Sequence, residues 1–119
     1  MPYVDGFLLP VPKKNLKTYT AIAKKAGKVW REHGALDYVE CVADDLDATW
    51  CQPLDKAVTM KPGDTVVFSY IVYKNRAHRD QVNKKVMADP RMNKIMDMNK
   101  MPFDMKRMFY GGFKGIVKA

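Results

Sequence analysis

A chain of 119 residues with 47% hydrophobic and 29% charged residues has the size and composition of one globular domain rather than of a disordered protein. Its apolar runs fall far short of the roughly 20 residues that a membrane helix needs, and two cysteines are too few for a disulfide framework. Because residues 1–5 show no secretion signal, we expect a single cytoplasmic domain over 1–119 with no membrane partner.

The net charge of +8 is divided unevenly along the chain. Residues 1–31 carry a net charge of +6, residues 32–64 carry −6 and residues 65–119 carry +8. An acidic middle between basic ends indicates separate acidic and basic surfaces. Such surfaces could favour self-association or attract an anionic ligand.

The N-terminal part of the chain predicts a strand followed by a long helix. Apolar residues over 3–10 indicate the strand, and Pro10 and Pro12 are expected to end it because proline cannot donate a hydrogen bond to a neighbouring strand. Over 13–33, apolar residues recur at spacings of three and four, which places them on one face of a helix. Gly34 stands where a left-handed residue would cap that helix.

The middle of the chain predicts two further strands. Residues 35–43 indicate the first of them, and an irregular stretch over 44–60 follows. The sequence Lys-Pro-Gly-Asp at 61–64 is typical of a tight turn in which the glycine takes a positive φ. Residues 65–73 are β-branched or aromatic almost throughout and give the strongest strand prediction.

The C-terminal part predicts two helices and a last strand. Asn75 stands at the N-cap position of a helix over 76–88, and Asp89-Pro90 repeats this kind of start for a short helix. Residues 107–117 indicate the last strand. Within it, the pair Gly111-Gly112 marks either a bulge or a close approach of two backbones.

This order of elements predicts an α+β, ferredoxin-like βαββαβ fold, in which a four-stranded antiparallel sheet carries the helices on one face. The other face should be polar if it meets water. Large apolar side chains nevertheless alternate to both sides of 65–73, with Phe68 and Tyr70 on one side and Ile71 on the other. We therefore expect a second copy to cover this face, so that a homodimer forms a dimeric α/β barrel. The alternative is that part of 45–61 folds over the sheet.

Four long stretches of the chain resemble the YbaA-like family of small bacterial proteins of unknown function. They are YVDGFLLPVPKKNL at 3–16, AGKVWREHGALDYVECVADDL at 26–46, TVVFSYIVYKNRAHRDQVNKKVMADPR at 65–91 and MPFDMKRMFYGGFK at 101–114. The resemblance implies a dimeric α/β barrel fold and a homodimer. It implies no catalytic residues, and the wider group of such barrels, which includes cofactor-free oxygenases, isomerases and haem enzymes, argues for function only by analogy.

A carboxylate inside a strand and a group of aromatic residues predict a small-molecule site. Asp5 stands within the first strand, where a buried carboxylate needs either a structural partner or a functional role. Tyr38 and Glu40 share one face of the second strand, and Tyr70 and Tyr110 could line the same space. Trp50, in loop 45–61, is a further candidate for this site. We expect these residues to bind a small polar-aromatic molecule between the sheet and loop 45–61, in a site that could serve a cofactor-free enzyme. The alternative is that the tyrosines stand at a wet barrel rim.

The N-terminus of the predicted second helix offers another candidate site. His78 and Arg79 fall in its first turn and could hold an anion there, or could simply form a solvated basic turn. No pattern of His, Cys or acidic residues has the spacing of a metal site, so we expect no metal and no cofactor. Cys41 and Cys51 are expected to be small buried thiols.

Two other classes of function compete with a small-molecule site. A non-enzymatic homodimer could act as an interaction module, for example in a stress response. Lysines of the first helix, among them Lys17 and Lys24, could contact phosphates of a nucleic acid. No nucleic-acid-binding motif or aromatic platform accompanies them, so we expect no specific nucleic-acid partner.

Overall fold

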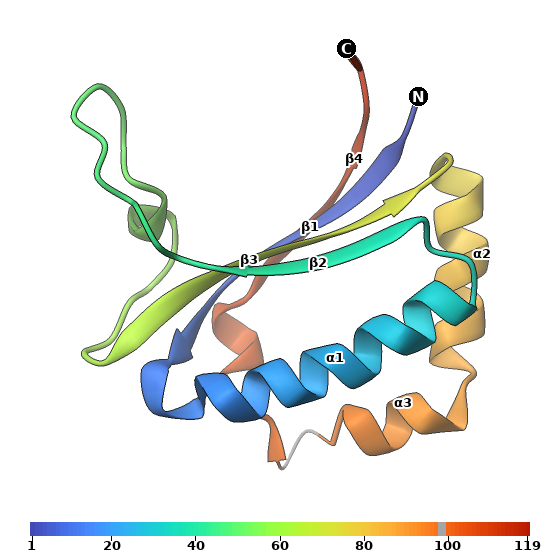
Figure 1. Cartoon of the computed structure of the whole chain (residues 1–119), viewed down its shortest axis with the longest axis horizontal. Coiled ribbons are helices and arrows are strands. Elements are labelled where there is room, and N and C mark those ends of the chain that lie inside the picture. The colour runs from blue at the N-terminus through green and yellow to red at the C-terminus, as the bar shows by residue number, and fades with distance from the viewer. Residues whose placement is uncertain (98–99) are drawn as a thin grey trace.

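The computed structural model describes residues 1–97 and 100–119 as a sheet with helices packed on one side (Figure 1). The strands are β1 (Tyr3–Pro12), β2 (Asp37–Val42), β3 (Asp64–Tyr73) and β4 (Phe109–Lys114), and the α-helices are α1 (Leu16–Glu32), α2 (Arg76–Met87) and α3 (Pro90–Ile95). Short 3-10 helices are η1 (Lys13–Asn15), η2 (Leu54–Ala57) and η4 (Met105–Arg107).

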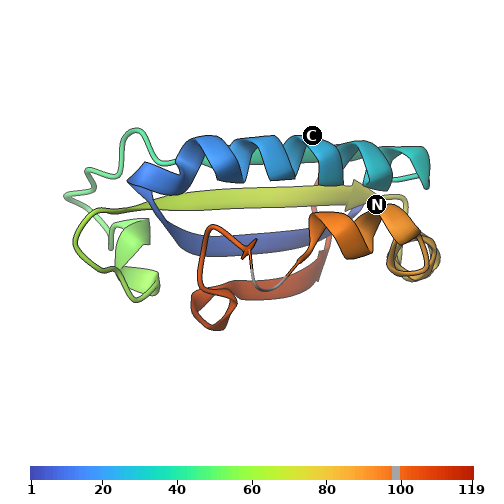
Figure 2. The ribbon, with the colours of Figure 1, turned by 90° about the horizontal axis from the view of Figure 1, so that it is seen from below.

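The sheet has the strand order β2-β3-β1-β4, and each neighbouring pair of strands is antiparallel. The helices α1, α2 and α3 lie on the same side of this sheet (Figures 1 and 2). The predicted α+β, ferredoxin-like fold of the subunit is therefore confirmed. Among the described residues, no helix combines the length and the apolar character that crossing a membrane requires.

Strand β1 runs two residues beyond the predicted range of 3–10, and it includes both Pro10 and Pro12. Pro10 and Pro12 pair with Val66 and Asp64 of β3. The pairing between β1 and β4 stops at Leu8, so the missing N–H groups of the two prolines face a side of β1 with no neighbouring strand. Proline is tolerated at such edge positions. The prediction that the strand stops at Pro10 is wrong for this reason, whereas Pro12 is the last residue of the strand as expected.

The helix boundaries follow the predicted capping residues. The Asn75 side chain accepts a hydrogen bond from the backbone N–H of His78 at the start of α2, and the Asp89 side chain accepts one from the backbone N–H of Arg91 at the start of α3. Gly34 takes a φ of 114° just after α1. This backbone conformation is unfavourable for any residue that carries a Cβ atom. Local capping chemistry thus sets where the helices begin and end.

Strand β4 is shorter than predicted and has no bulge at its glycine pair. Its register with β1 is uninterrupted, with Gly111 opposite Gly6 and Gly112 opposite Asp5. Gly112 permits a close approach, because a Cβ at this position would collide with the hydroxyl of Tyr3. The close contact is therefore with a side chain, and neither the predicted bulge nor the predicted approach of two backbones is found at this pair.

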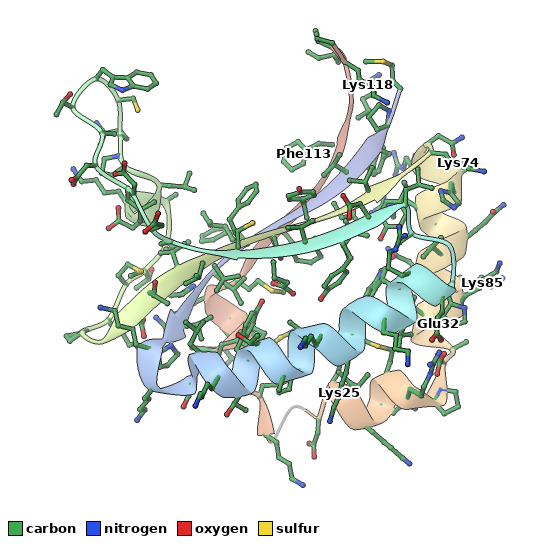
Figure 3. All side chains as sticks on the ribbon, in the orientation of Figure 1. Lys25, Glu32, Lys74, Lys85, Phe113 and Lys118 are labelled. Carbon is green, nitrogen blue, oxygen red and sulfur yellow. The ribbon has the colours of Figure 1, made fainter. Side chains whose placement is uncertain are left out.

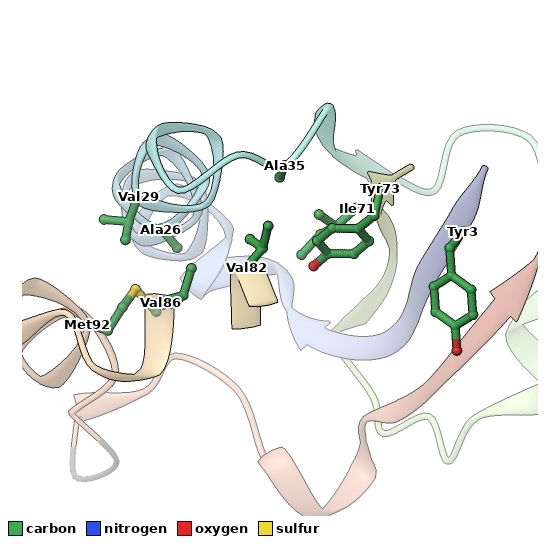
Figure 4. Packing of buried hydrophobic residues seen from close by; sticks show 9 residues of the cluster. All are labelled: Tyr3, Ala26, Val29, Ala35, Ile71, Tyr73, Val82, Val86 and Met92. Atoms are coloured by element: carbon green, nitrogen blue, oxygen red, sulfur yellow. The ribbon is translucent and has the colours of Figure 1, made fainter. Parts of the chain in front are cut away.

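The helices bury two apolar clusters against the sheet. The larger cluster joins β1 and β3 to α1, α2 and α3 (Figure 4), and it includes Tyr3, Ala26, Val29, Ile71, Tyr73, Val82, Val86 and Met92. The smaller cluster contains Leu9, Val11, Tyr19, Ala23 and Val67. A large apolar side chain contributes roughly 1.5–3 kcal/mol to the stability of the fold when it is fully buried. Both clusters include residues of α1, so both hold this helix against the sheet.

The face of the sheet that the helices leave uncovered, which we call the open face, is apolar. The strand registers place on it Val4, Leu8, Val39, Phe68, Tyr70, Val72, Phe109 and Phe113. Phe68 is 45% exposed, Phe109 is 56% exposed and Phe113 is 64% exposed. Figure 3 shows Phe113 on the side of the sheet away from the helices. The segment between β2 and β3 does not shield these three rings.

That segment, residues 43–63, is fastened to the sheet near its end. Arg107 Nη1 donates to Asp64 Oδ2 at 2.8 Å and to the carbonyl of Thr59 at 2.9 Å. The Asp64 side chain is buried. The hydrogen bond from Arg107, supported by one from the backbone N–H of Lys61, holds the pKa of Asp64 below its ordinary value. The ion pair therefore stabilises the base of this segment while the carboxylate is charged.

We expect the Asp64–Arg107 pair to contribute to the pH dependence of unfolding. Because the folded-state pKa of Asp64 is lowered, its stabilising contribution is present above the ordinary aspartate pKa of about 3.9 and is lost as the pH falls through the folded-state pKa. The urea midpoint of Asp64→Asn should drop less than that of the wild type between neutral pH and about pH 3. Asp44→Asn, at an exposed position, should keep the full drop. Equal drops for wild type and Asp64→Asn would contradict this role.

Candidate functional site

The structure separates the residues of the predicted small-molecule site. Asp5, Tyr38 and Glu40 point to the helix side of the sheet, whereas Tyr70 lies on the open face. Trp50 is 88% exposed in the segment between β2 and β3. Tyr38, Glu40 and Tyr70 all line one small cavity on the helix side of the sheet, although the Tyr70 side chain points to the other face. Asp5 and Trp50 do not line this cavity.

Glu40 and two tyrosines form a polar cluster between α1 and β2, which we call the Glu40 cluster (Tyr19, Tyr38 and Glu40). The Tyr19 hydroxyl donates to Glu40 Oε1 at 2.7 Å, and the Tyr38 hydroxyl donates to Glu40 Oε2 at 2.8 Å. Burial, followed by the neighbouring carboxylate, raises the pKa of both tyrosines well above the ordinary value. Both hydroxyls therefore stay protonated at neutral pH and hold the carboxylate in one orientation.

The Glu40 cluster lines a cleft of about 550 Å³ between α1 and β2. Lys24, Lys28 and Arg31 line the cleft from α1, and its apolar lining comes from Leu16, Ala23, Val42 and Val67. The guanidinium of Arg31 is engaged with the carbonyls of Ala35 and Leu36. Lys24 and Lys28 are exposed at the surface. The cleft thus combines a fixed carboxylate with a basic rim.

A smaller cavity of about 110 Å³ lies between the helix side of the sheet, Met96 and residues 101–108. Tyr19, Tyr38 and Glu40 line this cavity as well as the larger cleft, and methionines complete its wall at Met96, Met101, Met105 and Met108. Methionine side chains adapt readily to irregular space. The hydrogen-bonded Glu40 cluster is therefore packed beside methionine side chains that can change their conformation.

Gly27 allows the Tyr38 ring to pack directly on α1. A Cβ added at Gly27 would lie 2.7 Å from the Tyr38 ring, which is closer than real atoms approach. A glycine inside a predicted helix is the sequence signal that could have indicated this contact. Tyr19 is not predicted from sequence either, because its helical spacing identifies it only as a core residue.

Asp5 belongs to a different polar cluster, where α2 meets β1 and β4. Asp5 is 1% exposed, and its Oδ1 accepts a hydrogen bond from Arg79 Nη1 at 3.2 Å. The same guanidinium donates to the hydroxyl of Tyr110 at 2.6 Å and to that of Tyr3 at 3.3 Å. Burial raises the pKa of Asp5, and the charge of Arg79 opposes this effect. The contacts give Asp5 a structural partner rather than an opening to a ligand.

The structure also separates the two residues of the predicted anion site. Arg79 turns inward to Asp5, while His78 Nδ1 accepts a hydrogen bond from the backbone N–H of Lys74 at 3.0 Å. In the described part of the chain, no group of three His, Cys, Asp or Glu side chains is arranged to hold a metal ion. Cys41 and Cys51 are free and exposed, so the prediction of buried thiols is wrong.

A model of the family described as protein of unknown function (DUF1428) matches residues 2–105 of the chain. The chain belongs to this family. It is 43% identical over 117 residues to the uncharacterized protein YbaA of Escherichia coli strain K12, with 98% of each chain covered. The same figures apply to YbaA of Shigella flexneri. The predicted family resemblance is therefore confirmed.

Solved structures resemble this DUF1428 chain in fold. An uncharacterized NIPSNAP domain protein from Burkholderia xenovorans matches with a TM-score of 0.58 at 9% identity, covering 98% of this chain and 97% of that chain. A dimeric ferredoxin-like protein from an uncultured marine organism matches with a TM-score of 0.52 at 10% identity, covering 100% of both. At such low identities the likeness concerns the fold alone, and it agrees with the architecture of the DUF1428 subunit.

Proposed function

We propose that this DUF1428 chain binds a small molecule in the cleft between α1 and β2, with Glu40 as the anchor. The observation that carries the proposal is the Glu40 carboxylate, which two buried tyrosine hydroxyls hold at the wall of a cleft of about 550 Å³. A carboxylate oxygen that accepts one hydrogen bond has a further lone pair for a ligand. Because the carboxylate is already oriented, a ligand would lose little free energy in ordering it.

The charges of the cleft indicate the class of ligand. A hydroxyl or ammonium group of the ligand would donate to Glu40, and a carboxylate or phosphate would lie near Lys24 and Lys28. The apolar lining from Leu16 and Val42 favours a short hydrocarbon body between the two ends. Small hydroxy acids and amino acids have this combination. Glu40 as a base would also supply the group for cofactor-free proton abstraction from such a ligand, while the tyrosine hydroxyls keep the carboxylate in place.

A thermal-shift titration with small hydroxy acids and amino acids tests this proposal. We expect at least one compound to raise the melting temperature of the wild type in a saturable way. Glu40→Gln should weaken that binding by about 10- to 100-fold, because a hydrogen bond to a charged group contributes roughly 1.5–3 kcal/mol. Tyr38→Phe should weaken it less, since Tyr19 would still orient the carboxylate.

Asp37→Asn provides a matched control for Glu40→Gln. Asp37 lies on the same strand, is exposed, and points away from the helix side, so its neutralisation should leave ligand affinity unchanged. Two results would oppose a Glu40-anchored site: the absence of any stabilising compound in the two ligand classes, or equal affinity of wild type and Glu40→Gln.

A homodimer is a second proposal, and the open face supports it. Phe68, Phe109 and Phe113 together make an exposed apolar patch of a kind that monomers rarely carry. A second copy that packs its own open face against this patch would bury all three rings twice, once in each subunit. The dimeric ferredoxin-like protein of similar fold supports a homodimer, though not a particular interface, by analogy. Sedimentation equilibrium at micromolar concentration should give the mass of two subunits, and the mass of one subunit would refute the dimer.

A further inference from the structure

Segment 43–63 projects from the sheet on the side of the open face (Figures 1 and 3). We call this segment the acidic arm, because residues 44–55 within it contain four aspartates and no basic residue. Trp50 in the arm is 88% exposed, and the neighbouring Cys51 is exposed as well. An exposed tryptophan beside an apolar face is typical of a contact residue for another protein chain.

Basic residues gather at the opposite end of the strands, which we call the basic end (Lys74, Lys114 and Lys118). Lys74 follows β3, Lys114 is the last residue of β4 and Lys118 lies beyond it, and all three are exposed. Figure 3 shows Lys74 and Lys118 at the end of the sheet away from the acidic arm. Figures 1 and 2 agree in placing the C-terminus apart from the arm. The two charged regions therefore cannot meet within one subunit.

This inference rests on the homodimer proposed above. In such a dimer the open faces of two copies can pack in different orientations, and the charge pattern favours one of them. A twofold axis parallel to the strands would place arm against arm and basic end against basic end, where like charges repel. A twofold axis in the plane of the sheets but diagonal to the strands carries the corner between β2 and β3, where the arm begins, over the opposite corner, where β1 begins and β4 ends. Each acidic arm then lies against the basic end of the other subunit.

We propose that the acidic arm of each subunit packs against the basic end of a second copy, with Trp50 in the contact and the arm aspartates near Lys118. The arm and Phe113 lie on the same side of the sheet (Figure 3), so one interface would cover Trp50 and Phe113 together. The bond between Arg107 and Thr59 fastens the base of the arm and limits the freedom that the arm loses on contact. Trp50 thereby has a role in assembly.

The native thiol in the arm permits a direct test. A Cys41→Ser background leaves Cys51 as the single thiol of the chain, and a short thiol-to-amine crosslinker then joins Cys51 to lysines within its reach. We expect crosslinks from Cys51 to Lys114 or Lys118, present in the dimer band on a denaturing gel. The same crosslinking is then done on an equal mixture of 14N- and 15N-labelled protein whose subunits have exchanged fully. Half of the crosslinked peptides should then join one light and one heavy chain. Crosslinks confined to Lys56 and Lys61 would place the arm on its own subunit.

Charge reversal supplies a second measurement. Lys114→Glu with Lys118→Glu should weaken the dimer by at least tenfold at low salt, and adding Asp44→Lys with Asp45→Lys to the same chain should restore most of the affinity. Lys17→Glu with Lys25→Glu makes the same charge change on α1 and should not alter the affinity.

These results separate failure of the arm contact from failure of the dimer. A wild-type dimer that shows no Cys51 crosslink to the basic end and is unaffected by charge reversal there would overturn the arm contact and leave the dimer standing. A wild-type chain that sediments as one subunit would overturn both. Crosslinks between subunits together with restoration by the paired reversal would establish the contact.

Discussion

Replacing Phe113 with aspartate is expected to weaken the homodimer by at least about 100-fold. Phe113 is 64% exposed on the open face, and its ring lies beside Gly6 and Gly111. Full burial of a phenylalanine contributes roughly 1.5–3 kcal/mol, and an unpaired carboxylate in the same place would cost further free energy. Each dimer contains the substitution twice, so a total loss above about 3 kcal/mol, or about 100-fold in Kd, is expected.

Sedimentation equilibrium over a dilution series measures this change, and circular dichroism checks that the variant still folds. Thr18→Asp introduces the same charge at an exposed position of α1 on the helix side and should leave the dimer intact. If Phe113→Asp sediments like the wild type while remaining folded, the open face is not the surface through which two copies associate.

Asp5→Leu is expected to lower the free energy of unfolding by about 3–5 kcal/mol. The Asp5 carboxylate and the Arg79 guanidinium are both buried, with side-chain exposures of 2% and 13%. Removing the carboxylate leaves the guanidinium among Tyr3 and Tyr110 without its buried partner charge, and only the exposed carboxylate of Asp80 remains beside it. The cost of an unpaired buried charge exceeds the loss of the hydrogen bond alone.

Urea denaturation of a double-mutant cycle tests this explanation. Asp5→Leu with Arg79→Met removes both charges and should recover most of the lost stability, since apolar replacements of a buried ion pair are often nearly neutral. Asp80→Asn is the control, because Asp80 lies 2.9 Å from Arg79 Nε but has a side chain that is 61% exposed, and it should change stability by less than about 0.5 kcal/mol. If the double variant is as unstable as the sum of the two single variants, the ion pair is not the origin of the effect.

The elements that local chemistry specifies were predictable from the sequence. Asn75 and Asp89 cap their helices as predicted, and Gly34 takes the positive φ that its position indicated. The exception is the end of β1, where Pro10 and Pro12 stay in the strand. Whether a proline interrupts a sheet depends on the presence of a strand on its N–H side, and the extent of β4 decides this.

The candidate site was predicted only in part. Tyr38 and Glu40, two positions apart on one strand, were expected on the same face, and the hydrogen bond between them joins their side chains. Tyr19 was not predicted, because its contact with Glu40 joins residues 21 positions apart. Trp50 was grouped with Tyr38 because loop 45–61, which contains Trp50, was expected to lie over the site. The chain turns to the open face between them, which places the two rings on opposite sides of the sheet.

The sequence by itself determined the kind and order of the secondary-structure elements, the family and the apolar character of both faces of the sheet. Each of these follows from periodicity, capping or direct comparison, which act over short distances in the chain. Only the tertiary structure decided that Arg79 pairs with Asp5, 74 positions away, rather than holding an anion. Only the tertiary structure, again, placed Glu40 between two tyrosine hydroxyls. Such contacts depend on strand register and on the rotation of each helix over the sheet, and the packing of the whole core sets both.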